Sequence, residues 1–193
     1  MVFGRNENLY VVDHLNNRVQ KFTKEGKFLL KWGTKGEGEG QFNLPWGIGL
    51  DTDGNVYVAD WRNDRVQKFT PEGKFLAAYG TAGDHDGEFH RPSSVAVDQD
   101  DNMYVADWGN NRVQVLGPDG HFRIKLVGDA GLSKWAHEML PANPDYMEAR
   151  AVAKNRETER FLWGPTAVKL DAAGYLYIVD SCRYRIQIYR RSY

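Results

Sequence analysis

The chain of 193 residues is 41% apolar and 13% aromatic, which is enough for a sizeable buried core and rules out a disordered chain. Its 25 basic and 26 acidic residues nearly cancel, so the overall charge gives no support to a nucleic-acid or acidic-membrane binder. No apolar run approaches the roughly 20 residues that cross a bilayer, and no basic start with a long apolar stretch marks a signal peptide. We therefore expect a soluble globular protein whose compartment the sequence does not identify.

An eight-residue phrase recurs along the chain and sets its period. It reads Asp-Trp-Gly-Asn-Asn-Arg-Val-Gln at 107–114, and related copies stand at 13–20, 60–67 and 180–187. The first three copies follow one another at intervals of 47 residues. A period of this size indicates a repeat architecture.

The second unit shows the predicted elements most completely. Strands are expected over 46–51, 55–60, 65–70 and 74–79. Between the last two stands Thr70-Pro71-Glu72-Gly73, with proline where a turn needs its fixed φ and glycine where it needs a positive φ. Residues 23–26 and 117–120 occupy the same slot in the first and third units. A complete unit is therefore predicted to be a four-stranded antiparallel sheet, and the fourth unit is expected to lack its last strand.

In the second strand of each unit, the side chains that point to either face of the sheet are apolar, as at Tyr57, Val58 and Ala59. Both faces of the sheet must therefore be covered. Short four-stranded sheets of this kind, repeated and buried on both faces, are blades of a β-propeller. We place the units at approximately 1–33, 46–80, 93–128 and 165–193 of a single domain. Their first strands carry the small residues that a crowded innermost strand needs, Gly47, Gly49, Ser94, Ala96 and Ala167.

The units resemble NHL repeats. Each contains Gly-Gln-Phe at 40–42 or Gly-Glu-Phe at 87–89, then Pro45 or Pro92 before a short apolar strand, then Tyr-Val-Ala-Asp and Asn-x-Arg-Val-Gln. The resemblance covers nearly the whole chain outside 129–160. NHL repeats normally close as six-bladed rings, so the resemblance implies this architecture.

The repeat count falls short of a closed ring. The fourth phrase comes 73 residues after the third, and without the extra stretch about three and a half periods remain. We therefore expect an open arc of about four blades, as a fragment of a longer propeller or a piece completed by another chain. Its open blade edges could also support self-association.

The extra stretch at about 129–160 is predicted to be a helical hairpin. Its apolar residues follow the spacing of an amphipathic helix, at Leu132, Trp135, Ala136, Met139 and Leu140. Pro141 would end this helix, and Asn143-Pro144-Asp145 has the residues that start another.

One end of the blades is the predicted binding face. Strands alternate in direction, so the turns between the second and third strands emerge at the same end as the connections between units. This end collects aromatic, Arg and His side chains that favour binding: Trp46, Trp61, Arg62, His85, His90, Arg91 and Trp108. Capping of the blade edge remains an alternative for Trp61 and Trp108.

An Asp and an Arg five residues later recur in every phrase. A catalytic site is built once, whereas these pairs repeat, so we interpret them as structural braces of their hairpins. The pairs are Asp13 with Arg18, Asp60 with Arg65, Asp107 with Arg112, and Asp180 with Arg185.

An enzyme is the less favoured interpretation, and no catalytic residue, metal site or cofactor is predicted. Propeller lyases acting on peptidyl-hydroxyglycine, which share this fold, would be expected to place metal-binding histidines at positions where this chain has Trp46, Ser93 and Thr166. Another candidate zinc or calcium site combines His85 and His90 with Asp84, Asp86 and Glu88. The alternative interpretation of these residues is a charged loop exposed to solvent, without a metal. The single cysteine, Cys182, allows neither an intrachain disulfide nor a cysteine metal cluster.

The sequence thus predicts a non-catalytic binding scaffold for a protein partner or small ligand. One alternative is an incomplete metal-dependent propeller enzyme, similar to peptidyl-hydroxyglycine lyases or lactonases, with further ligands outside this chain. The other is an RNA-binding NHL module, which the nearly balanced charge of the 129–160 insertion does not support.

Overall fold

The structure, a computed structural model, describes residues 1–4, 7–128, 142, 144–145, 148 and 160–190. These residues form four antiparallel sheets, three of four strands and a fourth of three strands. The first holds β1 (Val2–Phe3), β2 (Leu9–Asp13), β3 (Arg18–Phe22) and β4 (Phe28–Trp32), and the second holds β7 (Pro45–Leu50), β8 (Val56–Asp60), β9 (Arg65–Phe69) and β10 (Phe75–Tyr79). The third holds β11 (Pro92–Val97), β12 (Met103–Asp107), β13 (Arg112–Leu116) and β14 (Phe122–Leu126), and the fourth holds β15 (Pro165–Leu170), β16 (Tyr175–Asp180) and β17 (Arg185–Arg190).

The connection between the first and second sheets contains a short parallel pair, β5 (Thr34–Lys35) with β6 (Gln41–Phe42). Ala82 and Phe89 form the matching bridge in the next connection. These connections therefore fold back on themselves before the next sheet begins.

A single 3₁₀ turn joins the second and third strands of every sheet. These turns are η1 (His14–Asn16), η2 (Trp61–Asn63), η3 (Trp108–Asn110) and η5 (Ser181–Arg183). Each is followed by a residue in the left-handed region, with φ between 51° and 53°: Asn17, Asp64, Asn111 and Tyr184. Asn and Asp tolerate this conformation better than other side chains, which explains their recurrence at the fifth position of the phrase.

The turn at the opposite end, between the first and second strands, is held by an aspartate. Asp51 Oδ1 accepts the backbone N–H groups of Asp53 and Asn55 at 3.0 and 2.8 Å. Asp98 and Asp171 make the same pair of bonds in the third and fourth sheets. Such side-chain to backbone bonds stabilise tight turns.

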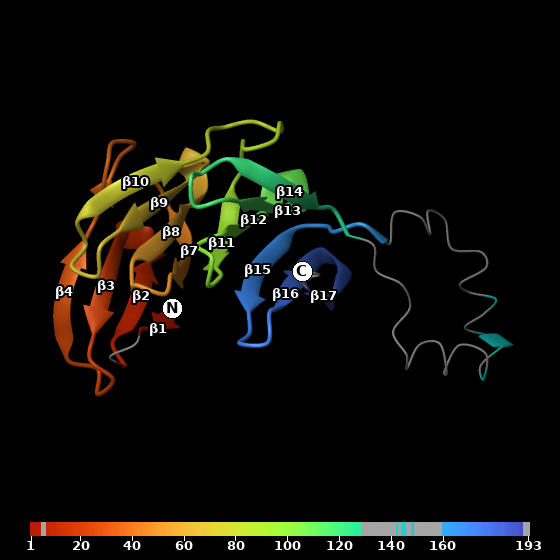
Figure 1. The fold of residues 1–193 in the computed structure, drawn as a ribbon, viewed down its shortest axis with the longest axis horizontal. Helices are drawn as coiled ribbons and strands as arrows, with labels where there is room; N and C mark the ends of the chain where they lie inside the picture. Colours follow the sequence, from red (N-terminus) through yellow and green to blue (C-terminus); the bar gives the residue numbers. More distant parts are fainter. Residues whose placement is uncertain (5–6, 129–141, 143, 146–147, 149–159, 191–193) are drawn as a thin grey trace.

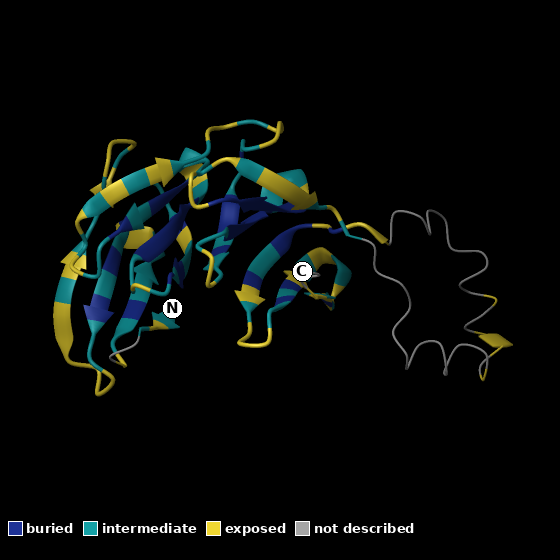
Figure 2. Cartoon of the chain, viewed as in Figure 1, coloured by how far each residue is buried: buried dark blue, intermediate teal, exposed yellow. Residues whose placement is uncertain are grey.

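In the part of the chain that the structure describes, the hydrophobic core lies between successive sheets and forms three clusters. Val19 with Val58 and Phe69 joins the first and second sheets. The second and third sheets meet through a cluster that includes Val66 and Val105, and the third and fourth through one that includes Val113, Val168 and Ile178. Figure 2 shows the resulting layers of buried strands between more exposed outer strands. The predicted burial of both sheet faces is therefore confirmed for the inner sheets.

The four sheets follow one another in an arc, with the first strand of each sheet on its inner side (Figure 1). β11 lies against both β7 and β15, and small residues allow this close approach. A Cβ on Gly47 or Gly49 would stand 2.5 Å from the backbone of β11. The inner side holds a groove of about 720 Å³ whose lining includes Trp46, Ser94 and Lys169. The prediction of propeller-type blades in an open arc is confirmed.

The helical hairpin predicted over 129–160 lies almost entirely outside the described residues. Among the residues that the structure describes, no helix has the length and apolar character that a membrane span requires.

Candidate functional site

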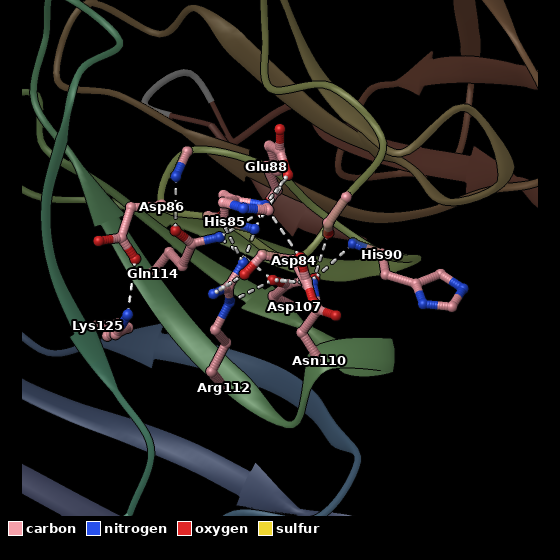
Figure 3. Close-up of polar contacts among 12 residues, drawn as sticks. Asp84, His85, Asp86, Glu88, His90, Asp107, Asn110, Arg112, Gln114 and Lys125 are labelled. Atoms are coloured by element: carbon pink, nitrogen blue, oxygen red, sulfur yellow. Dashed lines mark hydrogen bonds and ion pairs between the residues drawn. The ribbon is translucent and has the colours of Figure 1, made fainter.

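The Asp and Arg of the repeated phrase form a polar cluster together with its Gln, seen most fully in the third sheet (Figure 3). Asp107 Oδ2 accepts hydrogen bonds from Arg112 Nε at 2.7 Å, Asn110 Nδ2 at 2.9 Å and Gln114 Nε2 at 3.2 Å. Its Oδ1 accepts the backbone N–H of His90 at 2.7 Å. We call the Asp, Arg and Gln of each phrase a clasp.

The clasp of the third sheet also grips the loop that arrives from the second sheet. Arg112 Nη2 donates to the backbone oxygens of His85 and Glu88 at 2.8 and 2.9 Å. Gln114 Nε2 donates to the Glu88 oxygen at 2.6 Å, and Gln114 Oε1 accepts the Gly87 N–H at 2.9 Å. The clasp therefore bridges two units, in addition to bracing the hairpin to which it belongs.

The second sheet repeats this arrangement around Asp60. Arg65 Nε donates to the Asp60 carboxylate at 3.0 Å, and the Asn43 N–H donates to it at 2.8 Å. Arg65 Nη2 and Gln67 Nε2 both donate to the backbone oxygen of Gln41, at 3.0 and 2.7 Å.

In the fourth sheet, Asp180 accepts from Arg185 Nε and from the Trp163 N–H, both at 2.7 Å, and Arg185 Nη2 donates to the Phe161 oxygen at 2.9 Å. The loop gripped by this clasp follows the 129–160 insertion, so the insertion leaves this contact in place.

The clasp of the first sheet has the same internal bonds. Asp13 Oδ2 accepts from Arg18 Nε at 2.8 Å and from Gln20 Nε2 at 3.1 Å. Its Oδ1 accepts from Asn16 Nδ2 at 2.9 Å. In the other three clasps, Oδ1 accepts the backbone N–H of an incoming loop instead.

The environment shifts the pKa values of these carboxyl groups in opposite directions. Burial raises the pKa of Asp60 and Asp107, although the backbone and side-chain hydrogen bonds and the neighbouring guanidinium groups oppose it. The hydrogen bond from Asn16, together with the Arg18 guanidinium, lowers the pKa of Asp13 against a smaller effect of burial. Solvent access thus distinguishes clasps of the same composition.

A row of aromatic side chains crosses the predicted binding face. The His14 ring lies 4.9 Å from Trp46, Trp46 lies 5.6 Å from Trp61, and Trp61 lies 6.3 Å from Trp108, between ring centroids. We call these four residues the aromatic row. Trp46 is 51% exposed, and its ring also lines the inner groove.

Two arginines lie over the middle of the aromatic row. The guanidinium carbons of Arg62 and Arg91 are 5.9 and 5.1 Å from the Trp61 ring centroid, which is within the range of cation–π attraction. Among the carboxylates that the structure describes, none forms an ion pair with Arg62 or Arg91, whereas every clasp arginine has one. The two cations are oriented by the ring and leave their donors open to a ligand.

The histidines of the predicted binding face do not join the aromatic row. His85 lies in the exposed loop, where its Nδ1 is 3.0 Å from Asp84 and 3.1 Å from Glu88. The His90 ring points away from this group (Figure 3) and lies beside Gly109, where an added Cβ would meet it at 2.7 Å. The His90 backbone oxygen accepts the Gly109 N–H at 2.8 Å, so His90 lies beside the turn that carries Trp108.

Trp163 is an exposed aromatic that the sequence reasoning missed. It is 53% exposed, and the Arg183 guanidinium carbon lies 5.2 Å from its ring centroid. Its sequence signal is its place two residues before Pro165, where the other units have Asn43 and His90. The fourth sheet therefore carries a second Trp and Arg pair.

The carboxylate and imidazole atoms of Asp84, His85 and Glu88 lie within 4.8 Å of one another. The His85 and Asp84 side chains are 83% and 82% exposed, and hydrogen bonds within the loop account for their arrangement. The His85 backbone N–H, followed by its side chain, lowers the pKa of Glu88. At the positions where the lyases would place histidines, Ser93 Oγ donates a hydrogen bond to the backbone oxygen of Pro165 at 2.8 Å, and Trp46 is part of the aromatic row.

The repeated sheets define the protein as one built of β-propeller blades. The NHL repeat family model matches residues 42–69 and 89–116, so the chain carries NHL repeats in its second and third units. A search of curated proteins found no match.

Solved structures of similar fold include enzymes. A streptogramin B lyase is 14% identical with a TM-score of 0.60, over 98% of this chain and 53% of that one. Virginiamycin B lyase from Staphylococcus aureus is 14% identical with a TM-score of 0.59, over 100% and 55%. Hydrazine synthase of Kuenenia stuttgartiensis is 14% identical with a TM-score of 0.57, over 91% and 40%. This chain spans about half the length of the two lyases, and at this identity the likeness concerns the fold alone.

Proposed function

We propose that this chain is a non-catalytic binding module whose partner, a protein or a smaller ligand, docks on the aromatic row and its two arginines. The observation that carries the proposal is Trp61, whose ring lies beside Trp46 and Trp108 and beneath the guanidinium groups of Arg62 and Arg91. Trp and Arg are the residues that most often dominate binding energy in interfaces.

The turns that carry the aromatic row are anchored, which favours binding at a low entropic cost. Trp61 and Trp108 begin the short turns η2 and η3, which are anchored by the buried carboxylates Asp60 and Asp107. Each aromatic ring is thus presented by a rigid strand end. A surface that is ordered before the partner arrives loses little conformational freedom on binding.

A peptide library selected on the wild-type chain tests the proposal. Selected peptides should bind Trp61→Ala and Arg62→Ala at least about tenfold more weakly, because loss of a hot-spot contact costs about 2 kcal/mol. Leu15→Ala is the matched control, since Leu15 is 79% exposed at the same end of the first sheet and lies outside the row. Selected peptides that bind all variants equally would overturn the proposal.

A second candidate is an incomplete metal-dependent propeller enzyme. Its support is that neighbours of the same fold are lyases, one of them an inactive virginiamycin B lyase variant solved with quinupristin. The inner-strand positions of this chain oppose it, because Trp46, Ser93 and Thr166 offer no imidazole or carboxylate. A transition metal bound stoichiometrically to the purified chain would favour the enzyme over the scaffold.

A further inference from the structure

Arg62 and Arg91 reach the same indole ring from two different segments. Arg62 lies in the turn η2, next to Trp61, and its backbone N–H donates to the Asn43 oxygen at 3.0 Å. Arg91 lies directly before β11, and its backbone N–H donates to Asp64 Oδ1 at 2.6 Å. Both arginines are therefore held by their main chains, whereas their guanidinium groups rest on the Trp61 ring.

The backbone at Arg91 is an unfavourable place for a side chain. Its φ is 56°, in the left-handed region that residues with a Cβ seldom adopt. The matching residues of the other connections are Leu44 and Gly164, with φ of 52° and 64°, and a side-chain oxygen holds their N–H groups in the same way. The fold thus sets this backbone, and glycine satisfies it. An arginine here brings a cation to Trp61 at the expense of strain, and strained residues of this kind gather at functional sites.

The positive charge of this pair is not neutralised by the surrounding carboxylates. Asp60 and Asp107, buried beneath η2 and η3, are each paired with the arginine of their own clasp. Asp64 directs Oδ1 at the Arg91 backbone, and no described carboxylate forms an ion pair with either guanidinium group on Trp61. A carboxylate that arrives from a partner can satisfy such a group with two parallel hydrogen bonds.

The loops around this pair carry the opposite charge. Asn63 of η2 and Asn110 of η3 donate to the backbone oxygens of Gly36 and Gly83 at 2.8 Å, which holds these two loops beside the turns. The loops contain five acidic residues and one lysine: Lys35, Glu37, Glu39, Asp84, Asp86 and Glu88. A long polyanion such as a nucleic acid would meet these acids beyond Trp61, whereas a short segment with one or two carboxylates would not.

We propose that the partner of the aromatic row is a protein segment in which an Asp or Glu stands next to an aromatic or large aliphatic residue. The carboxylate binds the guanidinium groups of Arg62 and Arg91, and the apolar side chain packs against Trp46, about half of which is in water. The inference rests on the proposed function, because it names the chemistry recognised at the same site.

Two substitutions remove the charges with residues that the fold already accepts. Leu15 occupies in η1 the place of Arg62 in η2, and Leu44 occupies the place of Arg91 with nearly the same φ. The double variant Arg62→Leu/Arg91→Leu should therefore keep the thermal midpoint of the wild type. If it unfolds, Arg62→Lys/Arg91→Lys replaces it, because lysine keeps the charge but loses the two-pronged geometry.

The experiment selects peptides from a random library on the full wild-type chain and then exchanges the acid of the tightest peptide for its amide. The exchange should weaken binding to the wild type at least about tenfold, because hydrogen bonds between charged groups are lost. It should change binding to the double leucine variant less than about twofold, since the cations that bind the carboxylate are absent. Arg123→Leu is the matched control and should behave as the wild type, because Arg123 is an exposed arginine already paired with Asp119.

The outcomes separate this inference from the proposed function. Tight peptides without an acid, or an amide peptide that binds as well as its acid, would overturn the inference and leave the aromatic row as a binding surface. Peptides that bind Trp61→Ala as well as the wild type, or a selection that yields none, would overturn both. A short single-stranded RNA that binds more tightly than the peptides, and that the double leucine variant releases, would assign the site to a nucleic acid and overturn the inference.

Discussion

The clasps of the third and first sheets contain the same Asp, Arg and Gln at the same spacing, yet they lie in different environments. Asp107 is fully buried beneath a loop and accepts four hydrogen bonds. Asp13 is partly exposed and accepts three, all from its own hairpin. A repeated motif therefore has no fixed energetic value. The loop seated on it decides how much solvent reaches the charges and how costly it is to lose one of them.

Asp107→Ala is expected to have the largest effect. Removing it leaves the Arg112 guanidinium buried without its carboxylate, which typically costs about 3 to 5 kcal/mol of unfolding free energy. Asp13→Ala should cost no more than about 1 kcal/mol, because its partner remains accessible to water. Denaturant unfolding of both variants measures the difference, and similar losses would show that loop seating does not determine the value of a clasp.

Gln114→Ala should be the next most destabilising change. It leaves the Gly87 N–H without its acceptor and removes one of the two donors to the Glu88 backbone oxygen, which keeps Arg112 Nη2, in a partly buried site, at a cost of about 1 to 3 kcal/mol. Gln20→Ala is the matched control in the first sheet and should lie within about 0.5 kcal/mol of the wild type. Hydrogen exchange at Gly87 should accelerate in Gln114→Ala, and unchanged exchange there would contradict the assigned bond.

The two carboxyl groups should contribute to pH dependence with opposite signs. The pKa of Asp13 is lowered in the folded chain, so its stabilisation is present above its ordinary pKa of about 4 and is lost as the pH falls through the folded-state value. The pKa of Asp107 is raised, so its contribution is present below about pH 4 and is lost as the pH rises through the folded-state value.

Unfolding free energies measured from about pH 3 to about pH 6 test these signs. Asp13→Asn should reduce the loss of stability on acidification. Asp107→Asn should instead remove a loss that accompanies rising pH. Slopes that change in the same direction in both variants would refute the contrast between the open and the occupied clasp.

Apart from the control Gln20→Ala, Trp46→Ala should have the smallest effect on stability, because about half of Trp46 is already in water. We expect a change of less than about 1 kcal/mol in unfolding free energy, even though the aromatic row is the proposed binding surface. A loss as large as that of Asp107→Ala would assign Trp46 to packing and remove it from the proposed site.

Part of the candidate site could be predicted because strand direction follows from the repeats. The alternation of strands places Trp46, Trp61 and Trp108 at one end, and their rings do form a row. The same reasoning grouped His85 and His90 with them. His90 does lie beside the turn that carries Trp108, because its backbone oxygen accepts the Gly109 N–H at 2.8 Å, whereas the path of the loop pairs His85 with Asp84 and Glu88. A connection can fold back on itself, as the bridge between Ala82 and Phe89 shows, and loop paths have no fixed period in sequence.

The reach of each clasp into the neighbouring unit was also beyond sequence reasoning. Arg112 bonds to backbone oxygens 24 to 28 residues earlier in the chain, and a carbonyl oxygen leaves no mark in a sequence because every residue has one. The Asp and Arg spacing indicated a brace within a hairpin. The contact with the incoming loop depends on how two sheets pack.

The blade follows from the amino-acid sequence, since period, turn residues and two-sided apolar strands are local properties that repetition makes unambiguous. Packing between the sheets, by contrast, sets which copies of the phrase are buried, which tryptophans share one surface, and that the clasp of the first sheet holds no loop among the described residues. The physical reason is that burial and charge pairing arise between segments distant in the chain, so identical residues acquire different pKa values and different energetic roles from their neighbours.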